Sequence, residues 1–296
     1  MDADGRIQGL GTARQRAAFD AEAAEILAGL APPPPARPAE VPRRLWIYWG
    51  QGWDSAPEIC RLCLDSWRRW NPRHEVHALD AAGAEALLGP PGAELSVFPE
   101  RVRANVLRLR LMARFGGAWA DATLFCTAPL DAWLPLLTQR AGCFLFTVPQ
   151  AEKLVGTWFI AGNGHSPLLA LWGELFAALL ARRARAGGTL PFYFVMHRSF
   201  VVLLRHHPDA AAEWALCPRV AAQGPLALGN LLDLERRRGA AQDRPLSGDE
   251  RERAAALLAR FPLHKLSWKQ AMADGTRRAR SALELCRATL PGGAAG

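Results

Sequence analysis

A chain of 296 residues can bury a substantial core and has room for one large domain or two smaller ones. Although 50% of the residues are hydrophobic, no uncharged run approaches the roughly 20 residues that a membrane-spanning helix needs, so we expect a soluble or membrane-peripheral protein. The formal net charge of +8 favours an anionic partner such as a nucleotide sugar or an anionic lipid surface. Zinc-finger spacings, aromatic RNA-binding motifs and helix-turn-helix patterns are absent from the sequence, which argues against nucleic acid.

Arginine and cysteine add little to the functional prediction. The arginine-rich stretches at 236–238 and 277–280 are interpreted as solvated faces. The cysteines lack the dense spacing of a disulfide framework and mostly have apolar neighbours, so we expect free, buried thiols. Cys60 and Cys63 form a C-x-x-C pair, but no second pair completes a zinc site. The N-terminus lacks the basic-then-apolar pattern of a signal peptide, which predicts a cytoplasmic protein.

The first forty residues predict a helix and a linker. Apolar side chains recur at helical spacing from Phe19 to Leu30, and the proline-rich run that follows predicts a stiff, extended segment. We therefore expect the helix to stand apart from the main domain. The predicted organisation is an N-terminal helix at 1–30, a proline-rich linker at 31–40, a main domain at 41–270, and a C-terminal helix with a disordered tail at 271–296.

The next elements alternate between strand and helix. Residues 45–49 predict a buried strand, and Ser55 with Glu58 has the spacing of a capping box that opens a helix. Residues 75–79 predict a second strand, followed by a helix at 81–88. This order is typical of a parallel α/β architecture and of a nucleotide-binding half.

The central stretch from 105 to 129 predicts a helix, a double glycine and a strand. Val102, Val106 and Leu109 form an apolar stripe on the helix, whereas Arg101, Asn105 and Arg108 share a polar face. Gly116 and Gly117 follow where the helix should end, because glycine enters the left-handed conformation that closes a helix.

A single strand is predicted at 118–126. Asp121 and Thr123 emerge on one face of this strand unless it ends between them. Further strands are predicted at 143–148 and 157–161. Ser166 and Pro167 predict an N-cap and first-turn proline of a long helix, and further helices are predicted at 192–206 and near 251–260.

The central stretch resembles glycosyltransferase family 32 and the related capsular polysaccharide synthesis proteins, and its Asp-Ala-Thr version is closer to the capsular group. Three further motifs support the resemblance, namely VPRRLWIYWG at 41–50 with SWRRWNP at 66–72, WFIAGNGHSP at 158–167, and HKLSWK at 264–269. The resemblance implies a GT-A-type, nucleotide-diphospho-sugar transferase-like α/β fold, with a mostly parallel central sheet flanked by helices.

The resemblance also implies the residues of the site. Asp121 and Thr123 are the catalytic candidates, and Asp121 would anchor Mn²⁺ or Mg²⁺ together with the donor phosphates. Thr123 stands where the Asp-X-Asp relatives have a second acid. His264 is the other candidate metal ligand. The candidates for donor binding are Tyr48, Trp49, Asn105, Arg108, Trp158, Lys265, Ser267 and Trp268.

The function implied is transfer of a sugar from a nucleotide-diphospho-sugar donor to a polysaccharide, glycolipid or other lipid-linked glycan acceptor, with retention at the anomeric carbon. Three alternatives stay open. They are a protein-modifying, toxin-like glycosyltransferase, a non-catalytic nucleotide- or glycan-binding module suggested by Asn105 and Thr123, and a basic nucleic-acid binder.

Overall fold

The computed structural model describes residues 9–33, 39–237, 244–267 and 275–292. The chain divides into two compact units. The first unit comprises residues 1–42, 82–118 and 137–220, and the second comprises residues 43–81, 119–136 and 221–296. The predicted linker and the predicted C-terminal tail lie partly outside the described ranges.

The strands confirm a mixed α/β class. They are β1 (Arg44–Tyr48), β2 (Glu75–Leu79), β3 (Gly117–Asp121), β4 (Leu124–Cys126), β5 (Cys143–Thr147), β6 (Val155–Gly162) and β7 (Leu263–Lys265). The central sheet has the strand order β2-β1-β3-β6-β5 and is mostly parallel, whereas β4 and β7 form a separate pair. Within that sheet β5 and β6 run antiparallel.

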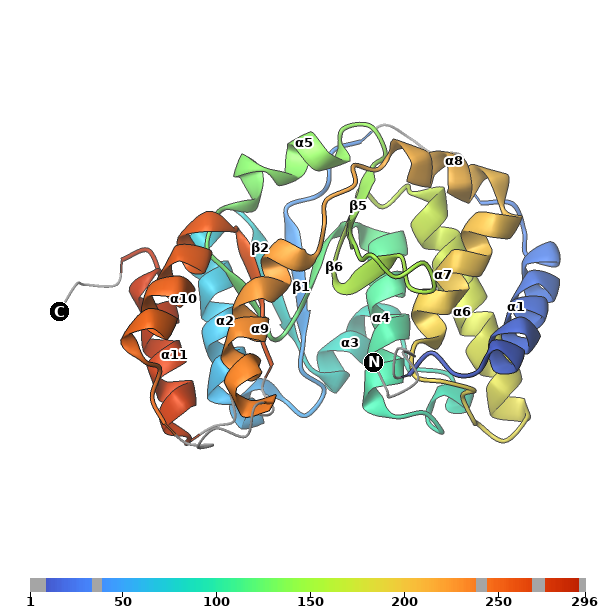
Figure 1. Cartoon of the computed structure of the whole chain (residues 1–296). Coiled ribbons are helices and arrows are strands. Elements are labelled where there is room, and N and C mark those ends of the chain that lie inside the picture. The colour runs from blue at the N-terminus through green and yellow to red at the C-terminus, as the bar shows by residue number, and fades with distance from the viewer. Residues whose placement is uncertain (1–8, 34–38, 238–243, 268–274, 293–296) are drawn as a thin grey trace. The chain divides into compact units, whose positions relative to one another are not determined.

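Strands and helices alternate from β1 to α3, whereas α6 to α10 follow one another along the chain (Figure 1). The α-helices are α1 (Ala13–Ala28), α2 (Glu58–Trp70), α3 (Ala81–Leu88), α4 (Glu100–Phe115), α5 (Leu134–Thr138), α6 (Pro167–Arg185), α7 (Val195–His206), α8 (Pro208–Leu216), α9 (Gln223–Arg237), α10 (Gly248–Arg260) and α11 (Arg277–Ala288). The short 3₁₀ turns are η1 (Trp53–Ser55), η2 (Ala93–Leu95) and η3 (Leu130–Ala132). Within the described ranges, every helix is too short or too polar to traverse a lipid bilayer.

The N-terminal helix α1 belongs to the first unit, where it packs against α6 and α7 (Figure 1). The Phe19 ring lies edge-on to the Phe192 ring, with centroids 5.3 Å apart. Asp20 forms an ion pair with the buried guanidinium of Arg198. The expectation that this helix stands apart is therefore wrong, because apolar and charged side chains of α1 find partners on α7 and on the segment just before it.

Helix α6 begins as its sequence predicts. The Ser166 hydroxyl accepts a hydrogen bond from the Leu169 backbone N–H, and Pro167 occupies the first turn. The helix buries Leu171, Trp172 and neighbouring side chains along the face that forms the core of the first unit. The six cysteines of the chain are free thiols in buried positions, which confirms the prediction of buried side chains.

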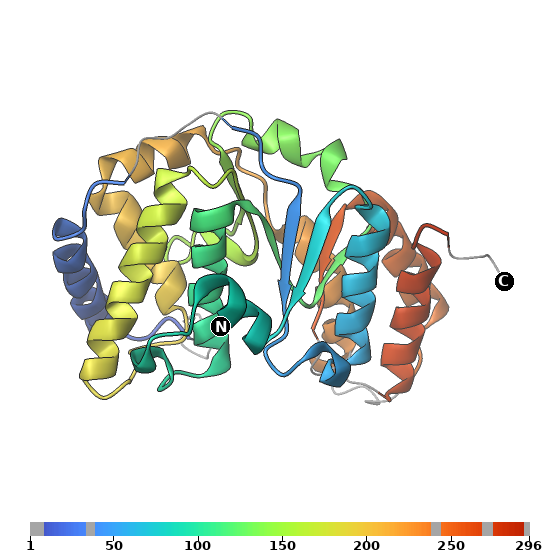
Figure 2. The same ribbon diagram turned by 180° about the vertical axis from the view of Figure 1, so that it is seen from behind.

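In the second unit β1 and β2 pair in parallel, with Leu45 opposite Val76 and Ile47 opposite Ala78. Helix α2 lies beside α11, as the view from behind shows (Figure 2). The Trp67 indole of α2 donates a hydrogen bond to the Leu124 carbonyl over 2.7 Å, which ties the helix to β4. This unit therefore has strands and helices from both ends of its sequence packed together.

The predicted capping box of α2 is wrong. The helix begins at Glu58 after Pro57, and no side chain caps it. The Ser55 hydroxyl donates instead to the carbonyls of Gln51 and Gly52, over 3.0 and 2.9 Å. Ser55 thus stabilises the η1 turn, because a serine hydroxyl can satisfy local backbone groups outside a helix as well as at its start.

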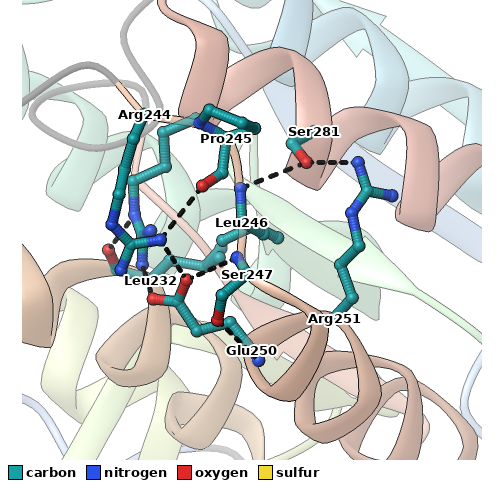
Figure 3. Close-up of polar contacts among 9 residues, drawn as sticks. Leu232, Arg244, Pro245, Leu246, Ser247, Glu250, Arg251 and Ser281 are labelled. Carbon is teal, nitrogen blue, oxygen red and sulfur yellow. Dashed lines mark hydrogen bonds and ion pairs between the residues drawn. The ribbon is translucent and has the colours of Figure 1, made fainter.

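Glu250 holds α9, α10 and α11 together in the second unit (Figure 3). Its carboxylate accepts hydrogen bonds from Arg278 over 2.8 Å and from Arg244 over 2.6 Å. The Ser247 N–H donates to it over 2.8 Å, and Arg278 also donates to the Leu232 carbonyl over 3.0 Å. The interpretation of 277–280 as a solvated face is therefore wrong at Arg278, which is only 4% exposed.

Glu250→Gln is expected to make the free energy of unfolding less dependent on pH. Burial alone would raise the pKa of Glu250, but the hydrogen bonds from Arg278, Arg244 and Ser247 outweigh it and lower this pKa from 4.5 to about 2. The stabilisation of the fold by the ionised Glu250 carboxylate is thus fully present above about pH 4.5 and is lost as the pH falls toward 2. At pH 7 the variant should lose about 2–3 kcal/mol of unfolding free energy.

Urea unfolding at pH 7 and pH 3 checks this prediction. The difference in unfolding free energy between the parent and the Glu250→Gln variant should shrink at the lower pH. Glu252→Gln is the matched control, because Glu252 is exposed on the same helix. Equal losses for the two variants at pH 7 would contradict the prediction.

Candidate active site

The candidate site is built on the segment that follows α4. The helix ends at Phe115, and Gly116 adopts a φ of 61° and a ψ of −157°, so it has the positive φ that was expected but not the left-handed helical ψ. Only glycine populates this region readily. A Cβ at Gly116 would lie 2.8 Å from the Gly162 carbonyl oxygen, so the glycine also permits close approach to the end of β6. The turn directs the chain into β3, whose last residue is Asp121.

The predicted strand at 118–126 is divided into two. β3 ends at Asp121, a turn occupies 122 and 123, and β4 begins at Leu124. The division arises because β4 pairs antiparallel with β7, outside the central sheet. The Leu266 N–H donates to the Thr123 carbonyl over 2.9 Å and so extends that pairing by one step.

Asp121, Thr123 and Lys265 meet at this turn. The Lys265 ammonium donates to the Thr123 hydroxyl over 2.6 Å, and it lies 3.8 Å from an oxygen of the Asp121 carboxylate. The other Asp121 oxygen accepts a hydrogen bond from the Trp119 indole over 3.0 Å. The side chains of Asp121 and Lys265 are 26% and 22% exposed, so both are accessible to a ligand.

The strand β7 fixes the position of Lys265. Lys265 lies opposite Leu124 in the β4–β7 pair. On α9, Gly229 lies so close to this strand that a Cβ there would be 2.4 Å from the Lys265 carbonyl oxygen. The backbone of Lys265 is thus held between β4 and α9, while its ammonium faces Asp121.

His264 points away from this cluster, because neighbouring side chains of a strand alternate between its faces. It is fully buried, and its Nε2 lies 3.2 Å from the Thr127 hydroxyl. Burial lowers the pKa of His264 to about 4, against the opposing effect of the Phe261 and Leu258 carbonyls. The imidazole is therefore neutral at pH 7. The structure does not bring His264 to Asp121, and its role as a metal ligand stays a prediction.

An aromatic group continues the cluster toward β1. The Tyr48 ring lies at the end of β1, with its centroid 6.4 Å from that of Trp119. Trp49 is half-buried, and its backbone N–H donates to the Leu79 carbonyl over 2.9 Å. Sequence reasoning missed Trp119 as a site residue. Its position two residues before Asp121 on the same side of β3 is the pattern that identifies it.

Three of the predicted donor-binding residues belong to the first unit. Arg108 is buried rather than solvated, and it donates a hydrogen bond to the Thr157 carbonyl. The helical pattern mispredicts its exposure, because α4 is covered by β6 as well as by α6. The Trp158 ring stacks on Phe146 with centroids 4.9 Å apart and is 8% exposed, and Asn105 is half-buried on α4.

The His197 imidazole lies in the same part of the first unit. Burial, together with the charges of Lys153 and Arg108, lowers the pKa of His197 to about 3. This histidine is therefore a neutral side chain at pH 7.

The last predicted motif is described only in part. Ser267 is half-buried just after β7. Trp268 lies outside the described residues. In the described ranges, no group of three or more His, Cys, Asp or Glu side chains is placed to hold a metal ion.

Comparison with known proteins shows which family the chain resembles. Residues 33–281 match the family model described as "Capsular polysaccharide synthesis protein". The O-glycosyltransferase PaGT of Phomopsis amygdali is 23% identical over 172 residues, which cover 51% of this chain and 42% of that protein. The glycosyltransferase afumC of Aspergillus fumigatus (strain CBS 144.89 / FGSC A1163 / CEA10) is 24% identical over 162 residues, which cover 46% of this chain and 40% of that protein. The chain thus spans about two fifths of the length of these curated relatives.

The PaToxG glycosyltransferase structure aligns with 83% of this chain and 93% of its own, at a TM-score of 0.39 and 14% identity. Both curated relatives are glycosyltransferases by their names. The resemblance to glycosyltransferase family 32 and to its Asp-X-Asp motif stays a prediction. Because the family model matches most of its length, the chain belongs to the capsular polysaccharide synthesis protein family.

Proposed function

We propose that the chain is a glycosyltransferase of the GT-A type. It would move a sugar from a nucleotide-diphospho-sugar to a polysaccharide, a glycolipid or a related acceptor, with retention at the anomeric carbon. The observation that carries the proposal is the meeting of Asp121, Thr123 and Lys265 at the end of β3. The mostly parallel sheet and the family match support the same class of enzyme.

The chemistry of the donor explains why these residue types suit the reaction. When the bond between the sugar and the diphosphate breaks, negative charge develops on the diphosphate, and nearby positive charge stabilises it. Lys265 supplies such a charge, and the carboxylate of Asp121 orients it. The aromatic face of Tyr48, next to Trp119, is the surface that we assign to the base or sugar of the donor.

The described residues do not fit a resident divalent cation. Mg²⁺ and Mn²⁺ prefer carboxylate oxygens, and the cluster offers a single carboxylate. The two oxygens of Asp121 face the Trp119 indole and the Lys265 ammonium, and a cation would have to share this carboxylate with both. The prediction of Mn²⁺ or Mg²⁺ therefore rests on the family resemblance alone.

The remaining donor-binding candidates divide into residues that we propose contact the donor and residues that we propose shape the first unit. Ser267 and Trp49 are proposed to contact the donor from the second unit. In the first unit, the contacts of Arg108 and Trp158 favour a role in shaping the unit, with Asn105 as the more accessible side chain of α4.

A donor screen tests the proposed function. The protein is incubated with UDP-, GDP- and CMP-sugars, each with oligosaccharide, lipid-linked glycan or peptide acceptors, and the released nucleotide and the modified acceptor are quantified. Release of a nucleoside diphosphate from one class of donor is expected, together with transfer to a glycan acceptor. Transfer to peptides alone would instead identify a protein-modifying enzyme. Nucleotide binding without release would identify a non-catalytic module.

A further inference from the structure

The surroundings of the Lys265 ammonium have the composition of a cation site. Its nitrogen lies 2.6 Å from the Thr123 hydroxyl, 3.2 Å from the Leu266 carbonyl and 3.8 Å from the Asp121 carboxylate. Carboxylate, carbonyl and hydroxyl oxygens are the groups that hard metal ions take from proteins. Here the positive charge among these oxygens is carried by the side chain of the protein itself.

The sum of charges is consistent with this arrangement. A divalent cation between two carboxylates has a net charge of zero, and so does one ammonium beside one carboxylate. With Thr123 in the second position, one positive charge suffices to balance Asp121, whereas a second acid would leave the Lys265–Asp121 pair with an excess negative charge.

The Lys265 ammonium also has a proton to offer to a ligand. An ammonium group has three protons, and the two short contacts of Lys265 use two of them. At 3.8 Å the approach to Asp121 is an ion pair rather than a hydrogen bond. Among the described residues, the third proton is thus oriented by a charge without being committed to a short hydrogen bond.

We propose that Lys265, held by Asp121 and Thr123, takes the place of a divalent cation in neutralising the diphosphate of the donor, so that transfer proceeds without metal. This inference rests on the proposed glycosyltransferase function. In the step itself, the acceptor hydroxyl oxygen bonds to the anomeric carbon, and the bond from that carbon to the diphosphate oxygen breaks. The electron pair of the broken bond stays with the diphosphate, which also receives the proton of the acceptor hydroxyl. Lys265 remains protonated and donates a hydrogen bond to the departing diphosphate.

Calorimetry with UDP, GDP and inorganic pyrophosphate as probes tests the inference. Each probe is titrated into the parent protein in EDTA and again in excess Mn²⁺, and the affinities are expected to agree within about threefold. Lys265→Met removes the charge but retains the stem, and it should weaken binding in EDTA by about tenfold to a hundredfold. Lys265→Arg retains the charge and should restore most of the affinity. Arg253→Met, which removes an exposed arginine from α10, is the matched control and should bind as the parent does.

Two further variants distinguish neutralisation of the diphosphate by Lys265 from neutralisation by a metal ion. Thr123→Val removes the hydroxyl that orients the ammonium and should weaken binding by less than Lys265→Met, with the fold checked by circular dichroism. The double variant Thr123→Asp/Lys265→Met builds two carboxylates without the ammonium and should bind Mn²⁺ alone, measured by electron paramagnetic resonance, more tightly than the parent.

The outcomes distinguish failure of the inference from failure of the proposed function. Parent binding that is lost in EDTA and restored by Mn²⁺, with the Lys265→Met variant equal to the parent, would overturn the inference and leave the glycosyltransferase proposal standing. If no nucleoside diphosphate binds under either condition and no nucleotide sugar is consumed, the proposed function falls, and the inference falls with it.

Discussion

Asp121→Asn is expected to lower the turnover number of donor cleavage by about a hundredfold, because a misplacement of about 1 Å in a catalytic group has an effect of this size. The amide can still accept a hydrogen bond from the Trp119 indole. It loses the charge that directs the Lys265 ammonium toward the leaving group. The fold should be retained, because Asp121 is the last residue of β3 and its side chain is partly exposed.

The affinity for nucleoside diphosphate gives this prediction its second measurement. If Lys265 carries the neutralising charge, removing Asp121 makes the site more positive, and UDP or GDP should bind in EDTA at least as tightly as before. If a metal ion anchored by Asp121 carried the neutralising charge, the variant would bind UDP or GDP in excess Mn²⁺ more weakly than the parent does. Asp65→Asn is the control, because Asp65 pairs with Arg69 on the exposed side of α2. Near-normal turnover in Asp121→Asn at matched thermal stability would remove Asp121 from the active site.

Gly116→Ala is expected to destabilise the first unit by about 3–5 kcal/mol, from backbone strain and overpacking together. The φ of 61° and ψ of −157° at this position are unfavourable for any residue with a Cβ. The added carbon would also lie 2.8 Å from both the Gly162 carbonyl oxygen and the Gly164 nitrogen. These are backbone atoms, so relief requires movement of the chain rather than of a flexible side chain.

Gly187→Ala separates the two contributions. Gly187 has a φ of 95°, and a Cβ there would have no neighbour within 4 Å. Its loss should be confined to backbone strain, about 1–2 kcal/mol. Urea unfolding of both variants measures the difference. Similar losses at the two positions would show that close packing at Gly116 contributes nothing.

Local patterns predicted the regular elements of the chain well. The bounds of β2 and α3 agree with the predicted ranges, and the Ser166 cap follows from one hydroxyl and one proline. These features depend on residues close together in the sequence. The contact of Thr123 with Lys265, 142 residues apart, has no local signal, and the family resemblance only named both residues as site candidates.

The failures of the sequence analysis have a common physical origin in packing between distant segments. Helical periodicity identified one apolar face on α4, but β6 covers part of the other and buries Arg108. The break between β3 and β4 depends on β7, which lies more than a hundred residues further along. The burial of Arg278 depends on Glu250 in the same way. None of these partners is visible within a local window of sequence.

The alternation of His264 and Lys265 has a consequence for how β7 is selected during folding. Three residues form this strand, so its hydrogen bonds alone discriminate weakly between neighbouring alignments. A slip by one residue would turn every side chain to the opposite face, which would place the Lys265 ammonium where the His264 ring is fully buried. Burying an ammonium without a compensating partner costs several kcal/mol. The ammonium of Lys265, which we propose neutralises the diphosphate, thus also disfavours the misaligned strand. A neutral residue at 265 would weaken the selection of the correct alignment as well as the binding of the donor.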